Sequence, residues 1–165
     1  DANPLFTAGL TNTISWKGLN LSFLLTSSVG NDIYNASKIE MIGMYTGGNQ
    51  IKDVVRRWRI PGQITDIPKS NEIDNLKTST RWIEDGSYLK IKNITLSYNI
   101  THPALKKANI ARIQPYITLD NMITFTNYSG YDPEMSQYTS ATSMGIDWGT
   151  YPCVKTVLFG VNVEF

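Results

Sequence analysis

The end of the chain alternates strictly between apolar and polar positions. Counted backward from the terminus, every second residue is apolar, and the set is Phe165, Val163, Val161, Phe159 and Val157. The residues between them are mostly polar or small. Such alternation predicts a β-strand with one apolar and one wetted face. It constrains the fold strongly, because an apolar face that continues to a terminal aromatic residue needs an apolar medium or a second layer to cover it.

The same alternation predicts a hairpin near the start of the chain. Residues 6–16 and 19–29 each place apolar side chains on one parity, broken in the first by Asn12, and mostly Thr, Ser and Asn on the other. Lys17-Gly18 separates them, which is the length of a two-residue hairpin turn.

Two more alternating segments follow, at 87–100 and 113–125. In the first, the apolar positions change parity near Lys92-Asn93, which predicts a β-bulge. With the terminal segment, the sequence therefore predicts about five strands of roughly ten residues.

Two long stretches, about 31–86 and 126–152, lack this alternation. Within the first, short helices are predicted over 38–45 and 51–58, the second with Asn49 as its cap. Connections of this length are unusual in compact domains and indicate loops with a functional role.

The connections alternate between short and long. The tight turn at 17–18 and the short connection at 101–111, with room for one helical turn, are separated by the long ones. In an antiparallel meander, alternate connections lie at the same end. The predicted fold is therefore all-β, with two long loops on one side, as in outer-membrane barrels with short periplasmic turns and long extracellular loops.

Composition limits the classes of function that this chain can have. A net charge of +1 does not favour nucleic acid, and charged residues make up only 18% of the 165 residues, below the roughly 25% of soluble domains. No apolar run is long enough for a spanning helix, so a membrane role must use strands.

Cys153 is the single cysteine, which excludes an internal disulfide. The chain begins DANPLF without Met or signal peptide, and we expect it to be a fragment.

Four ordered segments resemble the C-terminus of the SusC/RagA-type TonB-dependent outer-membrane transporters of Bacteroidetes. They are SFLLTSSVGNDIYNAS (22–37), RWIEDGSYLKIKNITLSYNI (81–100), NMITFTNYSGYDPE (121–134) and GIDWGTYPCVKTVLFGVNVEF (145–165). The sequence departs from the family's pattern at Cys153 and inside the 38–80 stretch.

The resemblance implies that residues 1–165 are the C-terminal part of a large transmembrane β-barrel of roughly 22 strands, without the plug domain and the N-terminal TonB box. Transporters of this type import oligosaccharides, or peptides, with a SusD-like surface lipoprotein and energy from TonB. The chain is thus expected in the outer membrane of a Gram-negative bacterium, as a receptor and transport component and not as an enzyme.

A terminal strand that ends on an aromatic residue resembles the signal read by the barrel-assembly machinery. The resemblance assigns this role to Phe159, Val161, Val163 and Phe165. The same residues are equally expected to face lipid, and the two roles are compatible.

Aromatic residues in the long stretches are candidate contacts with ligand or partner. Aromatic faces stack on sugar rings, and the candidates are Trp82, Tyr128, Tyr131, Tyr138 and Trp148. The alternative is that these side chains fold the loops or lie at the membrane interface.

Catalytic and metal chemistry find little support. Asp132, Glu134 and Asp147 offer oxygen ligands for Ca²⁺, but their spacing matches no EF-hand, and no cofactor is expected. His102 is the only histidine, so a catalytic triad is not available. Glu84-Asp85 on a strand would face opposite ways, which is wrong for paired acid–base work.

One alternative fold remains at the level of sequence, a soluble β-sandwich that binds carbohydrate. It would need two inner faces packed together, whereas a barrel segment leaves its apolar face for lipid. A segment cut from a barrel has two unpaired edges, so the isolated fragment is expected to self-associate.

Overall fold

The computed structural model describes residues 1–165 except residues 46, 135, 139 and 141–142, which lie within the two long connections. The chain divides into two compact units. The sheet unit comprises Pro4–Val29, Ser87–Asn127 and Cys153–Phe165. The connection unit comprises Asp1–Asn3, Gly30–Gly86 and Tyr128–Pro152.

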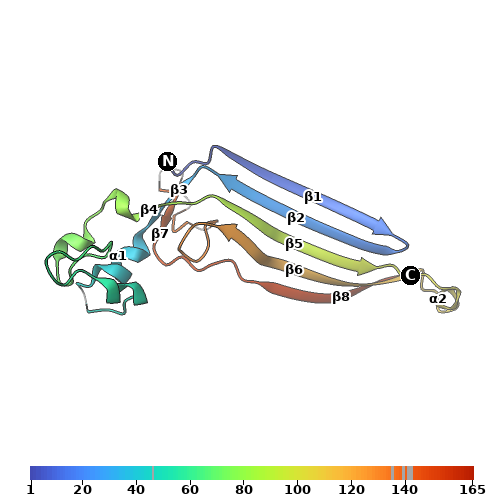
Figure 1. Cartoon of the computed structure of the whole chain (residues 1–165). Helices are drawn as coiled ribbons and strands as arrows, with labels where there is room; N and C mark the ends of the chain where they lie inside the picture. The colour runs from blue at the N-terminus through green and yellow to red at the C-terminus, as the bar shows by residue number, and fades with distance from the viewer. Residues whose placement is uncertain (46, 135, 139, 141–142) are drawn as a thin grey trace. The chain divides into compact units, whose positions relative to one another are not determined.

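The sheet unit contains one antiparallel sheet of five strands, which follow one another across the sheet in chain order (Figure 1). The strands are β1 (Phe6–Trp16), β2 (Leu19–Val29), β5 (Tyr88–Tyr98), β6 (Arg112–Thr126) and β8 (Thr156–Glu164). Each strand forms where the sequence alternates, because alternation lets an extended chain keep one face apolar along its whole length. The predicted all-β antiparallel meander is confirmed.

The first hairpin has the tight turn expected from its spacing. Trp16 pairs with Leu19, so Lys17 and Gly18 alone form the turn. Their φ angles are 47° and 89°, as a type I′ turn requires, and this turn matches the right-handed twist of the strands. Glycine adopts the second angle without a Cβ clash.

The change of parity in β5 is a bulge, as predicted. On β2, Leu24 pairs with Asn93 while Leu25 pairs with Ile91, so Lys92 is the extra residue. The shift restores the apolar positions of both halves of β5 to one face of the sheet.

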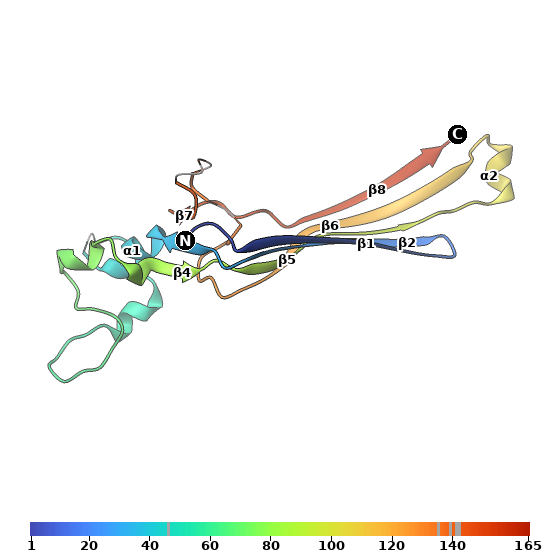
Figure 2. The same ribbon diagram turned by 90° about the horizontal axis from the view of Figure 1, so that it is seen from above.

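Both short connections lie at one end of this sheet (Figure 1). One is the tight turn and the other contains the single-turn helix α2 (Pro103–Lys107). His102 caps α2, because its Nδ1 atom accepts a hydrogen bond from the backbone N–H of Ala104 at 3.2 Å. The view from above shows the twist of the five strands (Figure 2).

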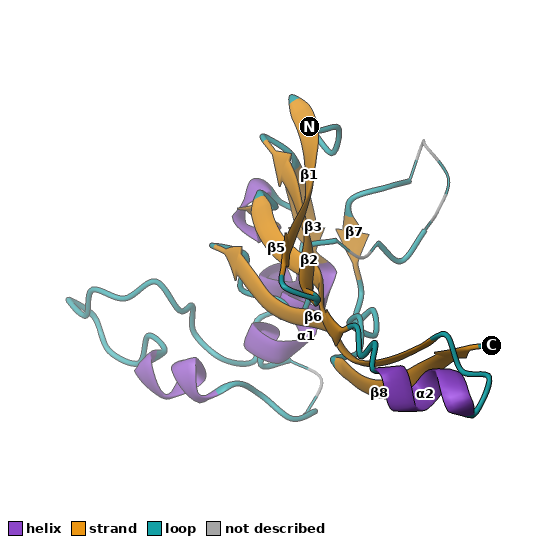
Figure 3. Cartoon of the chain, turned by 90° about the vertical axis from the view of Figure 1, so that its right-hand side faces the viewer, coloured by secondary structure: helices purple, strands orange, loops and turns teal. Residues whose placement is uncertain are grey.

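The connection unit has a small sheet of three strands, in the order β4-β3-β7, that the alternation did not predict. The strands are β3 (Asp32–Asn35), β4 (Ile83–Asp85) and β7 (Ile146–Asp147). The helices are α1 (Ala36–Gly43) and the 3₁₀ turns η1 (Lys52–Arg56), η2 (Ile73–Leu76) and η3 (Thr80–Trp82). Much of the rest is irregular chain (Figure 3).

The two predicted helices differ in outcome. The helix expected at 38–45 exists as α1, two residues earlier, because the Asn35 side chain caps it by accepting from the Lys38 N–H at 3.2 Å. The helix expected at 51–58 is only the 3₁₀ turn η1, and the cap expected at Asn49 is wrong, since Ile51 occupies the cap position. The helix stops because Arg57 is extended.

A small apolar core holds the connection unit. Ala36, Ile39 and Trp82 are buried together, with Tyr34, Leu76 and Ile146 packed around them. The Trp82 indole N–H donates to the carbonyl of Lys77 at 3.0 Å, which satisfies its polar atom inside the core.

The sheet unit is a single layer, whereas the sandwich alternative requires two. Among the described residues of this unit there is one sheet, and many of its large apolar side chains are exposed. No helix in the described parts of the chain has the length and hydropathy needed to cross a membrane.

Candidate functional site

The terminal strand presents its predicted apolar residues on one face of the sheet. Phe159, Val161 and Val163 are exposed, Phe159 to 74%. Phe165, directly after β8, is exposed too. The strand register places this row beside apolar residues of β6, with Phe159 opposite Ile117.

This apolar row continues across all five strands. Counting outward from Phe159, the register aligns Ile117, Leu96, Leu21 and Ile14. Side chains on one face contact one another directly across the strands. The sheet therefore carries a continuous apolar face from one edge to the other.

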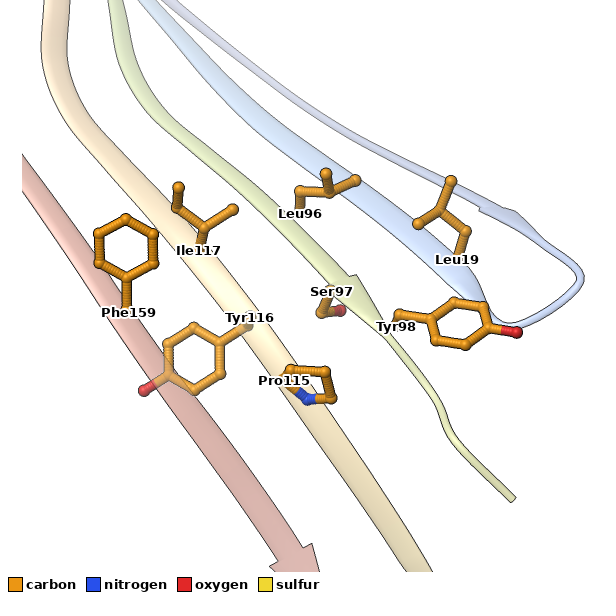
Figure 4. A pocket seen from close by; sticks show the side chains of 8 residues that line it. All are labelled: Leu19, Leu96, Ser97, Tyr98, Pro115, Tyr116, Ile117 and Phe159. Atoms are coloured by element: carbon orange, nitrogen blue, oxygen red, sulfur yellow. The ribbon is translucent and has the colours of Figure 1, made fainter. Parts of the chain in front are cut away.

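A shallow apolar groove of about 320 Å³ lies on this face (Figure 4). Its lining side chains come from β2, β5, β6 and β8 and are mainly Leu19, Leu96, Tyr98, Pro115, Ile117 and Phe159. The groove is a depression between side chains of neighbouring strands, so it extends the apolar face. Its lining includes the polar side chains of Ser97, Tyr98 and Tyr116 but is otherwise apolar.

The opposite face is polar, and its side chains bond to one another across strands. Asn93 donates to Asp120 at 2.7 Å, and the hydroxyls of Thr95 and Thr118 lie 3.0 Å apart. Thr13 likewise donates to Ser22 at 3.3 Å. One face is thus suited to an apolar medium and the other to water.

The five aromatic candidates in the connection unit separate into two groups. Trp82 and Tyr128 are buried, with exposed fractions of 2% and 6%, so their side chains support the fold of this unit. Tyr131, Tyr138 and Trp148 are exposed, to 78%, 50% and 58%. Of the five, only these three have rings that a ligand or partner can reach in this structure.

Tyr128 is held by a buried hydrogen bond. Its hydroxyl donates to Asp147 Oδ2 at 2.5 Å, while Asp147 Oδ1 accepts from the Thr150 N–H at 3.0 Å. Burial, together with the adjacent Asp147 carboxylate, raises the pKa of Tyr128 well above its usual range. Both oxygens of Asp147 are therefore engaged by protein donors, which lessens its value as the Ca²⁺ ligand considered above.

A polar cluster around Glu84 joins segments that are distant in sequence. The Glu84 carboxylate accepts from the Ser129 N–H and hydroxyl, both at 2.9 Å, and from the Lys38 ammonium at 3.0 Å. Asn35 also donates to it, at 3.2 Å. We name Glu84, Ser129, Lys38 and Asn35 the Glu84 cluster.

Electrostatics favour the ionised form of Glu84. Burial alone would raise the pKa of Glu84, but the hydrogen bonds from Ser129 and the charge and hydrogen bond of Lys38 outweigh burial and hold this pKa below its usual range. The neighbouring Asp85 is exposed, which agrees with the prediction that the two carboxylates face different ways. The sequence signalled only the acidic pair, because the partners of Glu84, which are Ser129, Lys38 and Asn35, are 45, 46 and 49 residues away.

No family model matches the chain, but individual proteins do. It is 31% identical over 170 residues to TonB-dependent receptor P3 of Formosa agariphila, covering 100% of this chain and 17% of that protein. It is 27% identical to TonB-dependent receptor SusC of Bacteroides thetaiotaomicron, covering 95% of this chain and 15% of that protein. The chain therefore spans about one sixth of the length of these relatives.

Solved structures agree with these sequence matches. The RagAB peptide importer in its closed-closed state superposes with a TM-score of 0.82 at 27% identity, covering 99% of this chain and 18% of the other. The open-open state of that importer gives a TM-score of 0.81, also at 27% identity, with 99% and 17% covered.

Proposed function

Since this chain is a β-barrel segment of a SusC/RagA-type TonB-dependent receptor, we propose that it forms five strands and two outer loops of an active nutrient importer. Receptors of this type are outer-membrane proteins and not enzymes, so the predicted location and the predicted lack of catalysis are both confirmed.

The two faces of the sheet support the proposed arrangement, and they are the observation that carries it. In an outer-membrane barrel, the outward face is apolar and meets lipid, while the inward face is polar and lines a wet lumen. The apolar face of this sheet, with Phe159 and Val161, would contact lipid, and the polar face, with Asn93 and Asp120, would line the lumen.

The ends of the sheet support an orientation. Short turns of outer-membrane barrels lie on the periplasmic side and long loops on the outside. The turn at Lys17-Gly18 and the helix α2 would then lie in the periplasm, and the connection unit would be extracellular. Phe165 would lie at the periplasmic rim, where interfacial aromatic residues are common.

The proposed partners follow from the relatives. The chain resembles one component of the RagAB peptide importer, and another relative is SusC. By analogy, a SusD-like lipoprotein would close over the extracellular side, and TonB would supply energy through a part of the receptor outside this segment.

The substrate is proposed to be an oligosaccharide, with a peptide as the second candidate. Exposed rings at Tyr131 and Trp148 can stack on sugar rings or on apolar peptide side chains. The likeness to RagAB, a peptide importer, is the reason why a peptide is kept as the second candidate. Uptake of a labelled probe of each class separates the two.

The test is uptake by cells that carry the complete receptor, or lack it. Fluorescent maltooligosaccharides and a fluorescent tryptic peptide mixture are the two probes, each with and without a protonophore. We expect receptor-dependent uptake of one probe that the protonophore abolishes, because TonB needs the proton gradient. Receptor-dependent uptake that persists with the protonophore would contradict active transport.

A paired variant tests the aromatic contacts. Replacing Tyr131 and Trp148 together by Ala should lower uptake at limiting probe about 10-fold, equivalent to about 1.4 kcal/mol of binding. Tyr45→Ala, an exposed tyrosine of the other long connection, is the control and should change uptake little. Equal uptake by both variants would remove the aromatic residues from the binding site.

A further inference from the structure

Glu84 stands at the meeting point of three segments of the connection unit. It belongs to β4, Asn35 and Lys38 belong to β3 and α1, and Ser129 lies near the start of the second long connection. Lys38 and Asn35 also lie 3.4 Å from the Ser129 hydroxyl, so donors from the first connection surround both groups. The cluster therefore fastens the second connection to the first.

Backbone pairing between the two connections is sparse. β3 and β7 share only two register pairs, Tyr34 with Ile146 and Asn35 with Asp147. A ladder of two pairs contributes few backbone hydrogen bonds between the strands. The apolar core adds one residue from the second connection, Ile146. Polar contacts must therefore contribute much to the positioning of this connection.

The carboxylate suits this task in a way that a neutral side chain does not. Both of its oxygens accept from Ser129, one from the N–H and one from the hydroxyl. An amide at the same position has one acceptor oxygen, and its NH₂ group would face a donor. The Lys38 ammonium supplies the opposite charge that a half-buried carboxylate needs.

The residues on either side of Ser129 are also constrained. Tyr128 points inward to Asp147. A Cβ atom at Gly130 would clash with the Tyr128 ring, so only glycine allows the chain to pass so close. Tyr131, next in the chain, is exposed. The three residues before the exposed ring of Tyr131 are therefore each constrained by contacts within the connection unit.

We propose that Glu84 is a positioning residue of the importer. By accepting two hydrogen bonds from Ser129, its carboxylate holds the exposed ring of Tyr131 in the arrangement that captures ligand. This inference rests on the proposed function, in which Tyr131 contacts the imported molecule. Glu84 itself is half-buried beneath its partners, and its effect on ligand is exerted through the backbone at Ser129.

The test combines hydrogen exchange with uptake, both on the complete receptor. In Glu84→Gln, protection of the Ser129 amide should fall at least 10-fold and uptake of the transported probe should fall several-fold. Glu72→Gln removes the same charge from an exposed glutamate paired with Lys69, and it should change neither quantity. Glu84→Asp retains the charge with a shorter reach, so both quantities should lie between those of wild type and Glu84→Gln.

The dependence on pH gives a signature that a loss of packing would not give. The pKa of folded Glu84 is lowered from 4.5. The stabilisation from its ionised carboxylate is therefore fully present above pH 4.5, and it is lost as pH falls through the lower pKa of the folded state. Protection of the Ser129 amide should therefore hold from pH 7 to about 4.5 and decline below it. Glu84→Gln should lack this acid decline.

The outcomes separate this inference from the proposed function. Unchanged protection of the Ser129 amide in Glu84→Gln would contradict the claim that the Glu84 carboxylate holds Ser129 in place. Lost protection with unchanged uptake overturns the positioning role, while wild-type uptake that a protonophore abolishes leaves the importer assignment standing. If wild type imports neither probe in an energy-dependent way, the proposed function fails, and with it the ligand-capture role, whatever hydrogen exchange reports.

Discussion

The sheet unit and the connection unit are stabilised by opposite means. The sheet unit has long backbone ladders, with eleven register pairs between β1 and β2 alone, and it leaves many of its large apolar side chains exposed. The connection unit has ladders of two or three pairs and buries a few residues together with polar clusters. The sheet unit needs an apolar medium to cover its exposed face. The connection unit covers its own apolar side chains and is held by specific side-chain contacts.

This difference teaches where substitutions should be harmful. In the sheet unit, the backbone carries the structure, and the medium decides which face tolerates charge. In the connection unit, a single buried side chain can hold distant segments together, because so few others do. Substitutions in the complete receptor test this contrast, and they are taken in descending order of their expected cost.

Truncation of the central tryptophan of the connection unit should have the largest effect. Trp82→Ala removes a side chain that is buried against Ala36 and Ile39, and should cost about 3–5 kcal/mol of local stability. Hydrogen exchange of the α1 amides measures this change. Trp148→Ala, at an exposed tryptophan, is the control and should stay within about 0.5 kcal/mol. A similar small cost at Trp82 would show that this core does not hold the unit.

A charge on the apolar face of β8 should come next. Phe159→Arg places a cation on the face proposed to contact lipid and should destabilise the receptor by about 2–4 kcal/mol. Denaturant unfolding from lipid vesicles measures it. Asn162→Arg, on the opposite face of the same strand, should cost much less, since that side is wet. If the two substitutions cost the same, the assignment of faces is wrong.

Removal of the Tyr128 hydroxyl should have a smaller effect. Tyr128→Phe leaves the buried Asp147 without one donor and should cost about 1–3 kcal/mol of local stability. Tyr151→Phe, at an exposed ring, is the control. Exchange of the 146–150 amides reports the difference.

The same variant has a pH signature. Because burial and Asp147 raise the pKa of Tyr128 above its unfolded value of 10.0, stability from the neutral phenol is complete below pH 10 and is lost as pH rises toward the folded pKa. Tyr128→Phe should lack this alkaline decline. A decline that persists in the variant would assign it to another group.

The sequence predicted the sheet unit well, for a physical reason. Alternation over about ten residues reports a two-faced strand directly, and the Lys17-Gly18 turn and the bulge at Lys92 are local features. The helix α1 was predicted within two residues of its position.

The connection unit was predicted poorly because its organisation is not local. β3, β4 and β7 have two to four residues each, too few to show a period. The predicted helix at 51–58 is only a 3₁₀ turn, since the chain beyond it folds back and the Trp58 N–H donates to the carbonyl of Ile67. This longer-range contact outweighed helical propensity.

The five-stranded meander with one apolar face can be predicted without the structure, because strand periodicity and turn chemistry are properties of neighbouring residues. Which aromatic residues are exposed, and which carboxylate is held by hydrogen bonds from distant segments, depends on the tertiary structure. Tyr128 and Tyr131 lie three positions apart and look alike in sequence, yet one is buried against Asp147 and the other is exposed. Glu84 and Ser129 meet across 45 residues, and contacts of that range depend on the path of the whole chain.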